Sequence, residues 1–166
     1  MPAFVINLLS LFVFRPLLTD LARDWEGENI KEFTDIVKKM MILIGALTIA
    51  ACVGAYLLGI PILSLVYGVD LRAYRMELVI IMICGGLNAY VYCLYYVVTV
   101  TGKQIFLLLG YGAGLIFAVF LGSSFVKSLG MLGAALSCTL SFGVVFIVFL
   151  IITSCVVKDR KKKTEV

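Results

Sequence analysis

The stretch RPLLTDLARDWEGENIKEFTDIVKK, residues 15–39, decides how this chain is organised. It holds more than half of the chain's ten acidic residues, whereas the segments on both sides of it are long apolar runs. Charges at this density are too costly to place in hydrocarbon, so the stretch must lie in water or at a membrane surface. It therefore predicts a polar connection between two segments that live in lipid.

The composition of the whole chain supports a membrane class. Hydrophobic residues make up 63% of the 166 residues and charged residues 14%, against about 25% charged residues in ordinary soluble domains. A chain of this length in water would still need a polar shell, so this much apolar surface requires a bilayer as solvent. The net charge of +4 comes largely from a basic cluster that follows the last apolar run. Such a cluster is typical of a membrane flank and argues against nucleic-acid binding.

Apolar runs long enough to cross a bilayer predict an all-α, polytopic transmembrane helix bundle. A hydrocarbon core about 30 Å thick needs about 20 apolar residues in a helix. Five such spans are expected, at residues 3–18, 40–62, 76–100, 105–122 and 131–157. Residues 19–39 form an amphipathic connector, the SSFVKSLG segment separates the fourth and fifth spans, and residues 158–166 form a disordered basic tail.

Three local features organise the connector and the second span. Asn29 followed by Glu32 resembles a capping box that starts a helix, and apolar residues then recur at helical spacing from Ile30. Trp25, the single tryptophan, is placed where an interfacial anchor is expected. Pro61 predicts a bend where the second span ends.

The distribution of basic residues predicts the orientation. Lys and Arg near span ends are retained preferentially in the cytoplasm. Placing the tail inside leaves only Arg72, Arg75 and Lys127 outside. The chain is then a multi-pass membrane protein with its N-terminus outside and its C-terminus cytoplasmic. Since the first span is short and lacks the features of a signal peptide, we expect a fragment in which Met1 lies inside a former helix.

A polar stripe on the third span is the main candidate site. At 100° per residue, Glu77, Asn88, Tyr92, Tyr95 and Thr99 fall on one face of the helix. One interpretation is that these groups only form hydrogen bonds with a neighbouring helix. The other is that Asn88, Tyr92 and Tyr95 line a water-filled cavity for a polar solute, since tyrosine offers sugars a flat ring and a hydroxyl.

Arg15 is the one charge expected within a span. It either extends to the cytoplasmic interface or faces a cavity and attracts an anionic group such as a diphosphate. Small residues on the last two spans, Gly110, Gly114, Gly130, Ala134, Ser137 and Ser141, predict close helix packing.

Catalytic and metal chemistry have no expected site. The chain has no histidine, and its five cysteines fall in apolar runs without a CxxC pair. We expect neither an enzyme nor a bound cofactor or metal.

The order of several strings resembles a known family. These are FRPLLTDLARDW (14–25), GIPILSLVYGVDLRAYR (59–75), GGLNAY (85–90), TGKQ (101–104) and GMLGAALSCTLS (130–141). Together they resemble the C-terminal part of bacterial polysaccharide transporters, the lipid-linked oligosaccharide flippases of the multidrug/oligosaccharidyl-lipid/polysaccharide superfamily.

The resemblance implies a fold and an activity. Members have two six-helix lobes around a cationic cavity, and this chain is similar to five helices of the second lobe. It would then help to flip undecaprenyl-diphosphate-linked oligosaccharide across the bacterial plasma membrane by alternating access, with the missing N-terminal helices as its partner. Arg15 would contact the diphosphate, while Asn88, Tyr92 and Tyr95 would line the glycan path.

Two alternatives stay open. A cation-coupled multidrug exporter of the same superfamily would need an intramembrane carboxylate, and Glu77 is the one candidate, at the outer edge of its span. A non-transporting membrane subunit would instead pack against a larger partner through its glycine and serine faces.

Overall fold

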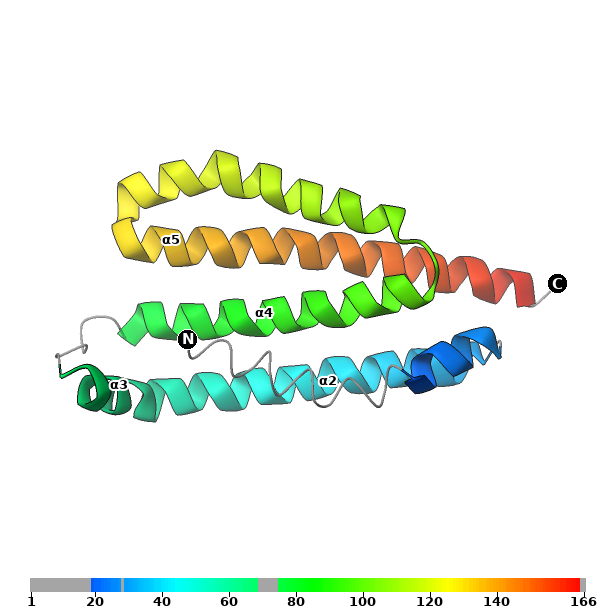
Figure 1. The fold of residues 1–166 in the computed structure, drawn as a ribbon, viewed down its shortest axis with the longest axis horizontal. Coiled ribbons are helices and arrows are strands. Elements are labelled where there is room, and N and C mark those ends of the chain that lie inside the picture. The colour runs from blue at the N-terminus through cyan, green and yellow to red at the C-terminus, as the bar shows by residue number, and fades with distance from the viewer. Residues whose placement is uncertain (1–18, 28, 69–74, 165–166) are drawn as a thin grey trace.

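The computed structural model describes residues 19–27, 29–68 and 75–164, which form helices and short turns (Figure 1). Residues 19–26 are helical. The elements that follow are α2 (Ile30–Gly54), the π-helical turn η1 (Ala55–Gly59), α3 (Ile60–Tyr67), α4 (Arg75–Val100) and α5 (Ile105–Thr164). No β strand occurs in the described part of the chain.

Among the described residues, three helices are long and apolar enough to cross a membrane, over Ile30–Gly59, Met76–Val100 and Ile105–Lys161. The all-helical membrane class expected from the sequence is therefore confirmed. The expected first span, 3–18, lies outside the described residues, so the total of five spans stays a prediction.

The longest helix, α5, is a hairpin of two arms. Gly130 breaks it with φ 58° and ψ −127°, a backbone conformation suited to glycine, and the chain then runs back beside itself (Figure 1). The arms correspond to the expected fourth and fifth spans. The SSFVKSLG segment is not the separate loop expected, because residues 123–129 continue the first arm, where the Ser128 hydroxyl donates a hydrogen bond to the Ser124 carbonyl at 2.8 Å.

The connector and the second span are also more continuous than expected. Helix α2 begins at Ile30, with Asn29 at the N-cap but without a side-chain capping bond. Phe33, Met40 and Ile44 are its buried residues, so the apolar face expected in the connector leads directly into the span. No proline interrupts this helix, and it therefore runs unbroken from the polar region to Gly54.

The backbone changes its helix type next to Pro61, where the sequence predicts a bend. Proline lacks an N–H and clashes with the carbonyl four residues earlier in an α-helix. The helix widens into the π-helical turn Ala55–Gly59 directly before it and continues as α3. Gly68 ends α3 with φ 66°, and its N–H donates to the Ser64 carbonyl at 2.9 Å.

Helix α4 is the central element, lying between α2 and the second arm of α5 (Figure 1). It packs on α2 through a cluster that includes Met40, Ile44, Met82 and Ala89. Its other side packs on α5 through Leu94, Val98 and Phe149.

A third cluster ties residues 19–26 to the end of α5. Trp25 packs on Phe33, with ring centroids 4.9 Å apart. Arg160 Nη2 donates a hydrogen bond to the Trp25 carbonyl at 3.1 Å, and its guanidinium carbon lies 4.4 Å from the indole centroid. This differs from the disordered tail expected over 158–166, because α5 continues to Thr164 and this contact anchors it.

Successive loops lie at opposite ends of the bundle, as expected for helices that cross a membrane one after another. Residues 19–27, the turn at 101–104 and the end of α5 lie at one end of the bundle, and the Gly130 turn lies at the other (Figure 1). Lys103 and Lys158 therefore share an end, opposite to Lys127. The side of the membrane that each end faces stays a prediction.

Candidate functional site

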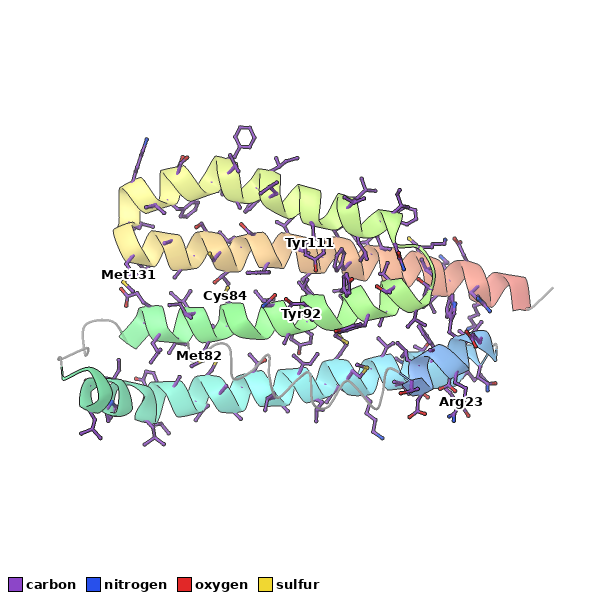
Figure 2. All side chains as sticks on the ribbon, viewed as in Figure 1. Arg23, Met82, Cys84, Tyr92, Tyr111 and Met131 are labelled. Atoms are coloured by element: carbon purple, nitrogen blue, oxygen red, sulfur yellow. The ribbon has the colours of Figure 1, made fainter. Side chains whose placement is uncertain are left out.

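The central part of the predicted polar stripe lies on α4 near the middle of the bundle and is partly exposed. Asn88 and Tyr95 are half-buried, and the Tyr92 residue is 43% exposed. Figure 2 shows Tyr92 far from both helix ends. Arg15, the remaining predicted site residue, lies outside the described residues.

Tyr111 on the first arm of α5 joins this group. Its hydroxyl lies near those of Tyr92 and Tyr95, and Figure 2 places Tyr111 at the same level of the bundle as Tyr92. The Tyr111 ring packs edge-on against Phe149, with centroids 5.3 Å apart and planes at 87°. Tyr111 remains 41% exposed, so the face it shares with Tyr92 is open.

Tyr111 is not among the site residues expected from the sequence. The nearby glycines indicate a packing role for its helix, and a single tyrosine in a span does not form a polar stripe. The local signal that could have identified it is its place between Gly110 and Gly112 in an otherwise aliphatic segment.

The glycines of the first arm determine how closely Tyr111 approaches the rest of the bundle. Gly110 lies directly over the ring of Phe149, and Gly114 lies over the Val145 side chain and faces the Ser141 carbonyl. These contacts confirm the packing role predicted for Gly110 and Gly114. The same prediction is wrong for Gly130, because nothing lies within 4 Å of a Cβ there and the residue forms the turn between the two arms instead. The close approach of the arms brings Tyr111 alongside the second arm.

A groove of about 460 Å³ runs between the two arms of α5 beside Tyr111. Its polar groups are the hydroxyls of Tyr111, Ser137 and Ser141. The serine hydroxyls donate to carbonyls of their own helix, Ser137 to Ala134 at 3.0 Å and Ser141 to Ser137 at 2.8 Å. Their oxygen lone pairs can still accept a hydrogen bond from a solute hydroxyl.

Hydrogen bonding bears on the two interpretations of the stripe. Thr99 Oγ1 donates to the Tyr95 carbonyl of its own helix at 2.8 Å. For Asn88, Tyr92 and Tyr95, the described part of the chain contains no side-chain hydrogen bond to a neighbouring helix. Polar groups exposed at the middle of a bilayer need water, protein or a solute as partner, so this face suits a cavity better than contact with lipid.

Glu77 stands apart from the tyrosines, in the first turn of α4. Its Oε2 atom is buried and has no hydrogen-bond partner among the described residues.

Comparison with protein-family models, with curated proteins and with solved structures finds no match to this chain.

Proposed function

We propose that this chain is part of a membrane transporter that flips undecaprenyl-diphosphate-linked oligosaccharide across the plasma membrane by alternating access. The main observation that supports this proposal is the open polar face at mid-bundle. It is formed by Asn88, Tyr92 and Tyr95 of α4 with Tyr111 of α5. Tyrosine rings and hydroxyls suit the apolar faces and hydroxyl groups of sugars. The resemblance of the sequence to polysaccharide flippases supports the same cargo.

In this proposal the polar face is one wall of a cavity completed by further helices. Rocking of one helix group against another would expose the wall to each side of the membrane in turn. The glycan would pass along the tyrosines while its diphosphate meets a cation, for which Arg15 is the proposed residue. The polyprenyl chain would stay in lipid throughout.

Flipping in proteoliposomes tests the proposal. Membranes from cells expressing the chain with its adjacent upstream reading frame supply the protein, and a fluorescent polyprenyl-diphosphate sugar is the probe. Protection of the probe from an impermeant quencher measures its movement between leaflets. We expect Tyr92→Phe with Tyr111→Phe to slow flipping about tenfold, as the loss of one or two net hydrogen bonds to the moving glycan would.

Tyr90→Phe is the matched control. Tyr90 is on α4 as well, but its hydroxyl would lie 2.7 Å from a Cβ placed on Gly45, so it faces α2 instead of the open face. Equal flipping by the double variant and the control, at equal amounts of protein, would exclude the tyrosine face from the transport path.

The multidrug exporter is a second candidate, because Glu77 has a buried carboxyl oxygen without a partner. Exporters coupled to cations need such a carboxylate to bind the ion. Glu77→Gln should abolish gradient-driven drug efflux if this candidate is right, while a flippase would retain lipid movement. An upstream reading frame that encodes no membrane helices would instead favour the non-transporting subunit.

A further inference from the structure

A second groove, which we call the α2–α5 groove, lies between the start of α2 and the second arm of α5. Its volume is about 600 Å³, and Leu94 of α4 contributes to its lining. Ile42, Leu94 and Leu150 line an apolar part of the groove, while Lys38, Lys158 and Lys161 line its other part. The open polar face described above shares none of these residues.

The three lysines come from two segments that meet at one end of the bundle. Figure 1 shows the start of α2 and the end of α5 at that end, together with the turn at 101–104. Lys38 is paired with Asp35 at 3.9 Å, but both side chains are more than two-thirds exposed, so the pair is weak. Lys158 and Lys161 form no ion pair with any residue that the structure describes.

Thr153 supplies a second, independent indication of a ligand. It lines the α2–α5 groove, is 9% exposed, and its Oγ1 atom is buried without a hydrogen-bond partner among the described residues. Other threonines of these helices, including Thr34, Thr48 and Thr139, donate to the carbonyl four residues earlier. Thr153 departs from this pattern, so its buried hydroxyl lacks a hydrogen-bond partner that a group in the groove could supply.

The groove therefore combines cations at the end of the bundle with an apolar channel toward its middle. Lysines near a membrane surface attract anionic lipid head groups, and aliphatic walls suit an acyl chain. A phospholipid also carries ester oxygens between its head and chains, and these can accept a hydrogen bond from a buried hydroxyl.

We infer that the α2–α5 groove binds an anionic glycerophospholipid. The phosphate lies among Lys38, Lys158 and Lys161, an ester oxygen accepts a hydrogen bond from Thr153, and one acyl chain follows Ile42, Leu94 and Leu150. The bound lipid joins the start of α2 to the end of α5. This site does not depend on the proposed transport function.

Native mass spectrometry of the full chain in a neutral detergent tests the inference, with phosphatidylglycerol and phosphatidylcholine as probes. The variant K38Q/K158Q/K161Q should bind phosphatidylglycerol at least about tenfold more weakly, because lysines near a phosphate contribute additively to lipid binding. The control K31Q/K39Q/K103Q removes the same charge from the same end of the bundle, outside the groove. It should weaken binding by less than about threefold.

A variant that preserves the shape of the side chain still tests lipid binding in the groove if the lysine variants fold poorly. Thr153→Val retains the volume of the side chain and removes the hydroxyl. We expect it to bind phosphatidylglycerol about threefold more weakly and to resist thermal unfolding in lipid-free detergent better than the natural chain.

Three results would overturn the inference. One is equal loss of binding in the two lysine variants, which would indicate general surface attraction. Another is unchanged lipid binding by Thr153→Val. The third is displacement of phosphatidylglycerol by an equimolar amount of undecaprenyl phosphate, which would assign the groove to the lipid carrier.

Discussion

Gly110 shows how a single missing side chain positions the candidate site. A Cβ at this position would lie 2.7 Å from Cδ1 of Phe149 and closer still to Cε1. The same Phe149 ring packs against Tyr111. The absence of a side chain at Gly110 therefore allows the first arm of α5 to lie close enough for Tyr111 to reach the tyrosines of α4.

We predict that Gly110→Ala destabilises the protein by about 1–3 kcal/mol, because the added methyl group overpacks the interface between the arms. Gly112→Ala is the control, since nothing lies within 4 Å of a Cβ there. It should be neutral or stabilise the helix by up to about 1 kcal/mol. Unfolding in a detergent titration measures both, and equal midpoints for the two variants would contradict the packing argument.

At the scale of elements, the reversal of α5 is the feature that makes this helix compatible with a bilayer. A straight helix of 60 residues would extend about 90 Å, roughly three times the thickness of the hydrocarbon core. The break at Gly130 divides it into two arms that pack on each other. The positive φ of this one residue therefore converts one very long helix into two segments, each short enough to be a membrane span.

We predict that Gly130→Ala costs about 1–3 kcal/mol, because its φ of 58° and ψ of −127° belong to glycine. Steric overlap does not contribute, since a Cβ at Gly130 would meet nothing within 4 Å. Gly122→Ala, equally uncrowded but inside the helix, is the control and should not destabilise the protein. Detergent unfolding again provides the measurement, and a Gly130→Ala variant as stable as the control would show that the turn adopts another conformation.

At the scale of the whole molecule, the grouping of charged loops leads to a prediction of orientation. The turn at 101–104, which contains Lys103, lies at the same end of the bundle as the basic end of α5 (Figure 1). The Gly130 turn, which closely follows Lys127 in the chain, lies at the other end. Retention of basic loops in the cytoplasm would place Lys103 inside and Lys127 outside.

Labelling with an impermeant maleimide in intact cells tests this orientation. The background is a variant in which the five cysteines, all unbonded, are replaced. A cysteine at position 127 should react in intact cells, whereas one at position 103 should react only after the membrane is opened. The reverse pattern would invert the orientation and would also move the three lysines of the α2–α5 groove to the outer leaflet.

The amino-acid sequence by itself determined the helical membrane class, the location of the apolar segments and the polar face of α4. These properties depend on hydrophobic runs and on side chains a few residues apart, so local composition and helical periodicity suffice to predict them. The same local reasoning predicted the backbone change at Pro61 and the packing of Gly110.

Only the tertiary structure decided which distant residues meet. It brought Tyr111 to the tyrosines of α4, Arg160 to Trp25, and Lys38 to Lys158 and Lys161. It also showed that Gly130 alone reverses α5, and that the helix continues through the segments expected to be loop and tail. These outcomes depend on contacts between helices far apart in the chain, and periodicity within one helix carries no information about its neighbours.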